Sequence, residues 1–209
     1  AFELFLRKEI LKIFPNDGIV GEEFGKRKTK SGFSWILDPI DGTVSFINGV
    51  PLFTTLVGVI KQGLPFLGVI DQPVLKDRWS GSDKRIIYKS NVAKTRPCEG
   101  VELASLYTTA HEIFDQSESI KFKNLENKVR SSRVGGTDCY HYGMLASGWI
   151  DIVCEKLSVY EYSAIVPIVK GAGGLITNWN GQIISGFDYK TIIAVGDPTI
   201  HNQALDLLS

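Results

Sequence analysis

The sequence is poor in cysteine and has no excess of charge of either sign. Its 209 residues include three cysteines, Cys98, Cys139 and Cys154, and none of them forms a CxxC pair. This odd, scattered set argues against a disulfide framework or a zinc site and favours a reducing cytoplasm, where we expect the protein to act. Lys plus Arg and Asp plus Glu both total 23, so net charge gives no reason to expect nucleic acid or an anionic membrane as a partner.

Long apolar runs and histidine-based motifs are also missing. No apolar stretch reaches the length of a membrane span, so we expect no membrane partner. The three histidines, His111, His141 and His201, lack the spacing of metal ligands, and no GxSxG motif accompanies them. We therefore interpret them as structural or surface residues, which leaves zinc, Ser-His-Asp and Cys-His chemistry without support.

What is present is an ordinary globular composition with a mixed secondary-structure pattern. The chain is 44% hydrophobic and 11% aromatic, which predicts a packed core. The first half is rich in hairpin signals and the second half alternates strands with helices, which predicts a layered α/β or α+β fold with mixed sheets. We expect a single domain over residues 1–209, with two lobes that meet near residues 80–94.

Apolar spacing and turn residues give expected positions for the main elements. Helices are expected at residues 2–13, 140–147, 163–170 and 199–208, and strands at 53–60, 66–70, 103–107, 150–154, 175–177 and 192–195. Sheet is also expected from Phe33 onward, and residues 26–32 are expected to form a mobile surface loop. Because Ala1 is not Met and already reads as helical, we expect the natural protein to begin earlier, with part of its N-terminal helical region missing here.

The most informative stretch is WILDPIDGTVSFING, residues 35–49. An apolar strand ends at Asp38, and Asp41 follows after a proline that blocks a regular inner strand. If both carboxylates point to one side, their repulsion needs a cation, and hard oxygen ligands select Mg²⁺, Mn²⁺ or Ca²⁺ over zinc. Gly42 permits a turn, and the free N–H groups of Gly42 and Thr43 could hold an anion such as phosphate. The alternative is a capped turn with surface aspartates.

A second acidic pair supports the metal interpretation. Glu22 and Glu23 follow Gly21 at the end of an earlier apolar element. Read alone, two adjacent glutamates are most often solvated. Read beside Asp38 and Asp41, they give the composition of a two- or three-metal phosphatase site that acts on a phosphate monoester.

These motifs resemble the inositol monophosphatase family. The resemblance rests on GEEFG, on WILDPIDGTVSFINGVPLFTTLVGVI, on GVIDQPVLKDRWSG, and on VGGTDCYHYGMLASGWIDIVCEKLSVYEYSAIVPIVKGAGGLITNWNG. Within the family, DQPVL, GTDCY and GAGG look most like the histidinol-phosphate phosphatase branch. The resemblance covers nearly the whole chain. It implies a sugar-phosphatase-like αβαβα architecture, magnesium dependence, a homodimer, and a small phosphorylated metabolite as substrate.

The resemblance also implies roles for particular residues. Two or three Mg²⁺ ions, with Mn²⁺ as an alternative, would be bound by Glu22, Asp38, the Ile40 carbonyl, Asp41 and Glu161. Catalysis would involve Glu22, Asp41 and Thr43, and phosphate would be held by the amides of Gly42 and Thr43. The leaving alcohol would be contacted by Arg133, Asp138 and Glu155.

The sequence departs from the family pattern near its last metal ligand. The family has Asp where this chain has Glu161, and the extra methylene moves the carboxylate, so the ion there is expected to bind less tightly or through water. The family's water-activating Asp would fall before Ala1, in the region that we expect to be missing. Asp138 could instead cap the following helix. Glu155 lies one residue closer to Glu161 than in the family, which weakens its assignment.

The predicted function is hydrolysis of a small phosphate monoester by metal-activated water. The expected substrate is histidinol phosphate, whose cationic amine suits Asp138 and Glu155, and the expected pathway is histidine biosynthesis. One alternative is inositol 1-phosphate or a related polyol phosphate. Another is a nucleotide 3′-phosphatase or sugar bisphosphatase, for which the chain lacks an extra basic cluster. A third is a non-catalytic homologue that binds metal without turnover.

Overall fold

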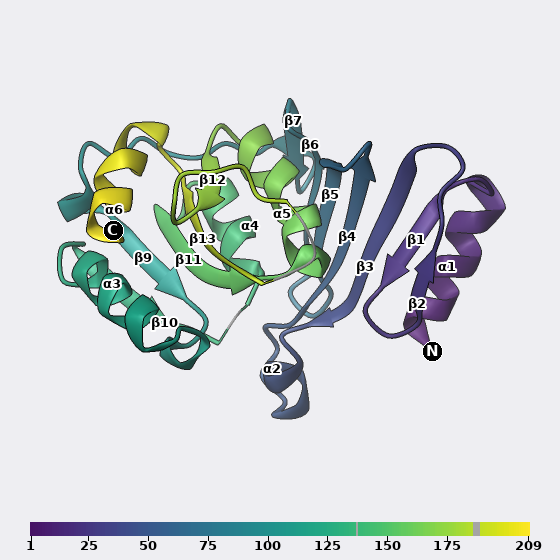
Figure 1. Ribbon diagram of the computed structural model, residues 1–209, viewed down its shortest axis with the longest axis horizontal. Helices are drawn as coiled ribbons and strands as arrows, with labels where there is room; N and C mark the ends of the chain where they lie inside the picture. The colour runs from purple at the N-terminus through teal and green to yellow at the C-terminus, as the bar shows by residue number, and fades with distance from the viewer. Residues whose placement is uncertain (137, 186–188) are drawn as a thin grey trace.

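Two β-sheets form the framework of the molecule (Figure 1). The computed structural model describes residues 1–136, 138–185 and 189–209. The eight-stranded sheet contains, in spatial order, β2 (Gly25–Arg27), β1 (Gly18–Gly21), β3 (Phe33–Asp41), β4 (Thr54–Lys61), β5 (Leu64–Gln72), β6 (Asp77–Ser82), β7 (Arg85–Tyr88) and β8 (Asn91–Val92). The five-stranded sheet contains β10 (Ser131–Val134), β9 (Ser105–Thr108), β11 (Ile152–Leu157), β13 (Lys190–Val195) and β12 (Leu175–Asn178). Both sheets are mixed, because β1 runs parallel to β3, and β9 runs parallel to β10 and β11, among otherwise antiparallel pairs.

Helices lie between the sheets and on both outer faces (Figure 1). α1 (Phe2–Ile13) covers the outside of the large sheet, α4 (Tyr140–Ala146) and α5 (Val159–Gly171) lie between the sheets, and α3 (Gln116–Glu126) and α6 (His201–Leu207) cover the small sheet. Short helical segments occur at α2 (Thr43–Ile47), η1 (Val101–Leu103), η2 (His111–Ile113) and η3 (Pro198–Ile200). The predicted layered α/β class is thus confirmed, in the layer order α, β, α, β, α. Among the described residues, no helix has the length and apolar character needed to cross a membrane.

Two hydrophobic cores account for the five layers. Trp79 of β6, Tyr142 of α4 and Ile165 of α5 are fully buried in the core between the sheets. Phe122 of α3 packs with Trp179 in a second core, under the outer helices of the small sheet. The small sheet is therefore covered on both faces, and most residues of β11 and β13 are buried.

The central helix α5 begins earlier than the sequence pattern predicts. It starts at Val159 rather than Ser163. Ser158 and Glu161 form a capping box, in which the Glu161 carboxylate accepts a hydrogen bond from the Ser158 N–H at 2.9 Å. The apolar run from Ser163 marks only the part of the helix that packs between the sheets.

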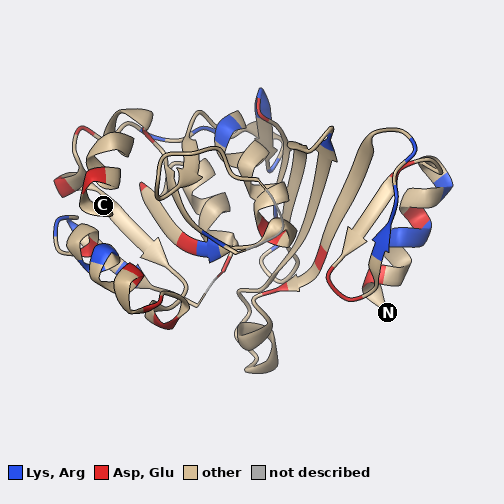
Figure 2. Cartoon of the chain, in the orientation of Figure 1, with Lys and Arg blue, Asp and Glu red and all other residues tan. Residues whose placement is uncertain are grey.

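One expected boundary is displaced and one helix was not predicted. The expected loop at 26–32 begins within β2, an exposed edge strand that ends at Arg27, and residues 28–32 form an exposed loop. The helix α3 is not expected from the sequence, because it carries both acidic and basic residues (Figure 2) and its apolar periodicity is weak. Its start carries a capping box between Asp115 and Glu118, and this short-range signal could have located it.

The contact between α5 and the large sheet generates a stability prediction. A Cβ at Gly68 would lie 1.9 Å from the Ala164 carbonyl oxygen, so Gly68→Ala forces α5 away from β5. We expect the free energy of unfolding, measured by urea denaturation with tryptophan fluorescence, to fall by about 1–3 kcal/mol. Gly196→Ala is the control, since its nearest neighbour would be 3.4 Å away. Equal stability of the two variants would contradict this packing.

Candidate active site

The end of β3 brings both aspartates of the DPID motif into one cavity. Side chains alternate between faces along a strand, so residues three apart, such as Asp38 and Asp41, normally point in opposite directions. The pairing register of β3 with β4 shifts between these two residues, as it does at a β-bulge. Both carboxylates consequently line the same cavity, which has a volume of about 400 Å³.

Segments from both sheets complete the walls of this cavity. They are the β1–β2 turn, the start of α2, the segment after β9, the segment before α4 and the first turn of α5. Figure 2 shows Asp and Glu residues, in red, at several of these segments. The described residues that line the cavity are Glu22, Asp38, Ile40, Asp41, Gly42, Thr43, Val44, Ser45, Thr109, Ala110, Ile113, Gly136, Asp138 and Glu161. The structure therefore brings together the residues predicted to bind metal and phosphate.

A glycine turn at the corner of the cavity sets the start of α2. Gly42 has a φ of 83°, in the left-handed region, and a Cβ there would lie 2.8 Å from Asp138 Oδ2. The next residue, Thr43, donates its hydroxyl proton to the Ile40 carbonyl oxygen at 3.2 Å. Only glycine satisfies both the backbone conformation and the close approach of Asp138.

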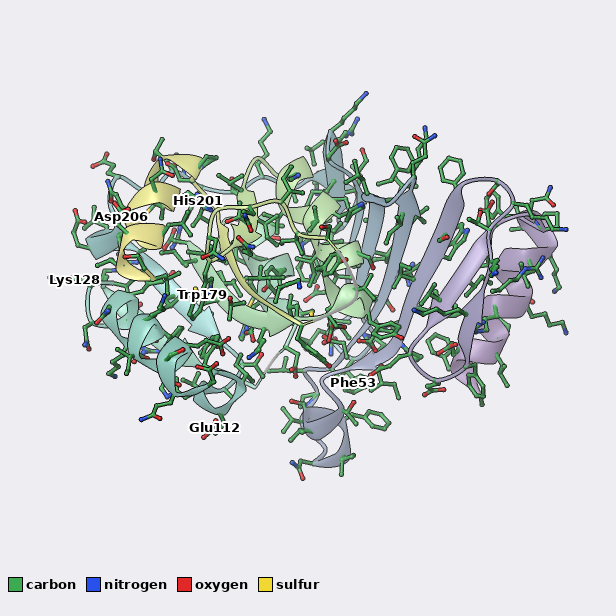
Figure 3. The ribbon with its side chains drawn as sticks, viewed as in Figure 1. Phe53, Glu112, Lys128, Trp179, His201 and Asp206 are labelled. Atoms are coloured by element: carbon green, nitrogen blue, oxygen red, sulfur yellow. The ribbon has the colours of Figure 1, made fainter. Side chains whose placement is uncertain are left out.

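The short helix α2 projects from the end of the large sheet and is held from two sides (Figure 1). The ring of Phe53, labelled in Figure 3, meets Phe46 edge to face with centroids 4.9 Å apart. The Ser45 hydroxyl donates to the Gly136 carbonyl oxygen. These contacts tie the α2 wall of the cavity to the segment that precedes α4.

Hydrogen bonds orient the two aspartates. The Asp41 carboxylate accepts from the Thr54 hydroxyl at 2.6 Å and from the Cys139 N–H at 3.0 Å. The Asp38 carboxylate accepts from the Ile40 N–H at 3.1 Å. Each aspartate is thus held in place while further oxygen lone pairs stay available for a ligand.

Burial and mutual repulsion raise the pKa values of the acidic side chains. The pKa of Asp38 is raised to about 10 by burial and then by the charges of Asp41 and Glu22. The pKa of Asp41 is raised to about 7, again by burial first and then by Asp138. Burial is also the main cause of the raised pKa values of Glu22 and Asp138. None of the described lining residues is Lys, Arg or His, so the described part of the wall offers no basic side chain to offset ionised carboxylates.

The donor set fits a hard divalent cation. Carboxylate and carbonyl oxygens at this corner are the ligands that Mg²⁺, Mn²⁺ and Ca²⁺ prefer. In the part of the chain that the structure describes, no three acidic, histidine or cysteine side chains are already grouped tightly enough to enclose an ion. Glu161 is turned toward the Ser158 N–H. A bound cation would offset the repulsion and draw the carboxylates together.

Asp138 lines the cavity and does not cap α4. The cap residue of α4 is Cys139, whose own side chain makes no capping hydrogen bond, and its N–H donates to Asp41 rather than to Asp138. Asp138 instead has a φ of 42°, an uncommon conformation for a residue other than glycine. The capping interpretation is therefore wrong, and the carboxylate is available to a ligand in the cavity.

Glu155 and Arg133 are not among the residues that line the cavity. Glu155, in β11, is 3% exposed, and its Oε1 accepts hydrogen bonds from the Thr109 N–H at 2.6 Å and the Thr109 hydroxyl at 3.0 Å. Arg133 is exposed on the edge strand β10 and donates to the Ser132 carbonyl oxygen at 2.9 Å. Glu155 would therefore affect a bound substrate indirectly, through the hydrogen bonds that it accepts from Thr109.

Thr109 is a polar cavity residue that the sequence motifs did not predict. Its hydroxyl gives its only proton to Glu155, so the oxygen has only lone pairs to offer to the cavity. Behind this pair, His141 Nδ1 lies 3.6 Å from Glu155 Oε1, and burial lowers the pKa of His141 to about 3. No local motif marks Thr109, because only the pairing of β9 with β11 brings it to Glu155.

The other histidines and the cysteines do not line the cavity. His201 Nε2 lies 2.8 Å from the Thr177 hydroxyl in the interior, and His111 pairs with Glu126 at 3.2 Å on the surface. The three cysteines are buried and free.

Solved structures share this fold. An inositol monophosphatase from Zymomonas mobilis aligns with a TM-score of 0.91 and 36% sequence identity, over 99% of this chain and 80% of that chain. An inositol monophosphatase from Anabaena (Nostoc) sp. PCC 7120 aligns with a TM-score of 0.88 over 99% of this chain and 83% of that chain; its 23% identity bears on the fold alone. The five-layer architecture is thus that of the inositol monophosphatases.

Sequence comparisons define the family. The profile of the inositol monophosphatase family matches residues 1–208. The chain is 39% identical to the bifunctional phosphatase IMPL2, chloroplastic, of Arabidopsis thaliana, over 95% of this chain and 60% of that protein. It is 32% identical to a histidinol-phosphatase of Mycobacterium tuberculosis, over 100% of this chain and 82% of that protein. The chain belongs to the inositol monophosphatase family, as its motifs indicate.

The raised pKa values predict how the metal-free protein responds to pH. Unfolding returns Asp41 and Asp38 to a pKa of about 3.9, whereas the folded values are about 7 and about 10. Because the folded values are higher, the stabilisation is complete below the unfolded pKa and is lost as pH rises through the folded values. In EDTA, the free energy of unfolding should therefore fall between about pH 5 and pH 9.

Urea denaturation at a series of pH values checks this prediction. Asp38→Asn should show a shallower fall than the unaltered protein, because one of the repelling charges is gone. Saturating Mg²⁺ should flatten the curve of the unaltered protein. Parallel pH curves for the two proteins in EDTA would contradict the electrostatic description of the cavity.

Proposed function

We propose that this protein is a magnesium-dependent phosphomonoesterase, with histidinol phosphate as its preferred substrate. The main support is the cavity itself, where buried carboxylates without a basic partner in the described wall adjoin a glycine turn. The family relationship also supports the proposal, because the related proteins of Arabidopsis thaliana and Mycobacterium tuberculosis are named as phosphatases. A small phosphorylated metabolite is the ligand that this combination favours.

The proposed metal ligands are those that surround the end of β3. Two or three Mg²⁺ ions, or Mn²⁺ in their place, would be held by Glu22, Asp38, the Ile40 carbonyl, Asp41 and Glu161. Bound ions would supply the positive charge that lowers the pKa of a water molecule and offsets charge on the phosphoryl and leaving oxygens. Glu161 has one oxygen engaged by the Ser158 N–H, which favours a single-oxygen or water-mediated contact.

The remaining catalytic tasks fall to residues of the glycine turn and its neighbours. The Thr43 hydroxyl donates to the Ile40 carbonyl, so its oxygen is free to accept a hydrogen bond from the attacking water and orient it. The amides of Gly42 and Thr43, at the start of α2, would hold charge that develops on the phosphoryl oxygens. Glu22 and Asp41 would complete the orientation of that water. Water attacks phosphorus in line, the bond to the alcohol oxygen breaks, and no covalent enzyme intermediate forms.

The leaving-group side of the cavity favours a substrate that carries hydrogen-bond donors. The Thr109 oxygen has only lone pairs to offer, and Asp138 adds a carboxylate. An ammonium group satisfies both acceptors and offsets the Asp138 charge. Histidinol phosphate has such a group, whereas inositol 1-phosphate offers neutral hydroxyls and is the second candidate.

Three further properties are proposed from the family resemblance. They are action in the cytoplasm, assembly as a homodimer and a place in histidine biosynthesis. The buried free thiols suit a reducing compartment.

Phosphate release by the full-length protein tests the proposed activity. With Mg²⁺, we expect kcat/KM to be higher for L-histidinol phosphate than for inositol 1-phosphate, and EDTA should remove both activities. Asp41→Asn should lower kcat/KM by about 100-fold or more, since even outer residues of metal sites cost 10–100-fold. Metal binding without release from either ester would instead favour the non-catalytic alternative, and a preference for the inositol ester would overturn the substrate assignment.

A matched pair of substrates tests the role of Asp138. The analogue 3-(imidazol-4-yl)propyl phosphate differs from histidinol phosphate only by lacking the amine. Asp138→Asn should reduce the preference for the amine-bearing ester by about 10-fold or more, because a charge-assisted hydrogen bond contributes about 1.5–3 kcal/mol. Arg133→Gln serves as a control outside the cavity wall. An unchanged preference in Asp138→Asn would show that Asp138 does not recognise the amine.

A further inference from the structure

A buried carboxylate on α1 contacts the turn that carries Glu22. Glu3 is 0% exposed. Its Oε1 accepts from Arg7 Nε at 2.6 Å, and its Oε2 accepts from the Glu23 N–H at 2.8 Å. The carboxylate therefore joins the helix to the residue that directly follows Glu22.

Arg7 extends this contact to the far end of the same turn. Its Nη2 donates to the Gly25 carbonyl oxygen at 2.5 Å. At the near end, Gly21 leaves the room that Glu3 occupies, because a Cβ there would lie 1.9 Å from Glu3 Oε1. The pair thus contacts residues 21, 23 and 25, and Glu22 lies among them.

The opposite side of the turn is held by the strand that carries Asp38. The Glu22 N–H donates to the Leu37 carbonyl oxygen at 3.2 Å, and β1 pairs in parallel with β3 up to Gly21 and Leu37. In Figure 1, α1 lies beside β1 and β2 at the edge of the large sheet. The backbone of Glu22 is therefore fixed between β3 on one side and the Glu3–Arg7 pair on the other.

The Glu3–Arg7 ion pair is better explained as a device that positions the turn 21–25 than as a source of folding stability. A buried ion pair is weak evidence for stabilisation, because removing two charges from water offsets most of their attraction. Apart from the Leu37 contact, the turn is closed only by the pairing of β1 with β2, a strand of three exposed residues. It must nevertheless present the Glu22 carboxylate to the cavity that Asp38 and Asp41 also line.

We propose that Glu3 and Arg7 are positioning residues of the metal site, which fix the turn 21–25 so that Glu22 stays directed at the cavity. The inference rests on the proposed function in that it takes Glu22 to be a metal ligand. Neither residue would touch the metal or the substrate.

Mg²⁺ titration calorimetry on the full-length protein tests this inference. Glu3→Gln keeps the shape of the side chain but replaces one acceptor oxygen with an NH₂ group. One of the two hydrogen bonds, from Arg7 or from the Glu23 N–H, is therefore lost. Gly21→Ala displaces Glu3 without changing its charge. Both variants should bind Mg²⁺ about 10-fold or more weakly, the usual cost of losing an outer residue of a metal site. Glu9→Gln is the matched control, since Glu9 pairs with Lys12 at 2.6 Å on the exposed face of the same helix.

Urea denaturation in EDTA separates positioning from folding. If Glu3→Gln and Gly21→Ala lose stability but bind Mg²⁺ as tightly as Glu9→Gln, the inference is overturned. If either variant fails to fold, Arg7→Lys replaces it. Lysine keeps the positive charge beside Glu3 but lacks the second nitrogen that reaches the Gly25 carbonyl oxygen. Unchanged Mg²⁺ affinity in Arg7→Lys would also overturn the inference. An unaltered protein that binds no Mg²⁺ would contradict the proposed function itself.

Discussion

Repulsion between buried carboxylates at the end of β3 is the constraint on which the site depends. Asp38 and Asp41 are 4% and 7% exposed, and burial alone disfavours the charge of each. The bulge in β3 turns both to one side, and hydrogen bonds from Thr54 and the Cys139 N–H prevent Asp41 from turning away. The fold thus gathers carboxyl groups whose ionised forms are destabilised until a ligand of opposite charge binds. Their ionisation lowers the stability of the metal-free protein, and a bound cation offsets this cost.

The two-sheet architecture explains how residues distant in sequence reach this point. The large sheet supplies the aspartates and the glycine turn, and the segment after β9 supplies Thr109 from the small sheet. α5 lies between the sheets and places Glu161 in its first turn. Close contacts such as that of Gly68 with Ala164 keep this helix in position. The packing of α5 against the large sheet thus helps to place Glu161 at the cavity.

The sequence predicted the parts of the site that local motifs encode. DPIDGT and GEE identify carboxylates, a bend and a glycine within a few residues, so their chemistry is visible without the fold. Glu155 and Arg133 were expected beside them, but β11 buries the first and the edge of β10 exposes the second. Contacts such as Asp138 with Gly42 depend on elements separated by about half of the chain, and no short pattern reports them. The helix α3 was missed for a different reason, since its charged sequence has little apolar periodicity.

A crystal structure of the protein soaked in Mn²⁺, with an anomalous difference map, tests the central claim most directly. Mn²⁺ prefers the same oxygen ligands as Mg²⁺ and scatters anomalously. The account predicts anomalous peaks between the carboxylates of Glu22, Asp38 and Asp41, with Glu161 nearby. A map without a peak in this cavity, from crystals saturated with Mn²⁺, would contradict the claim that the carboxylates at the end of β3 form a metal site.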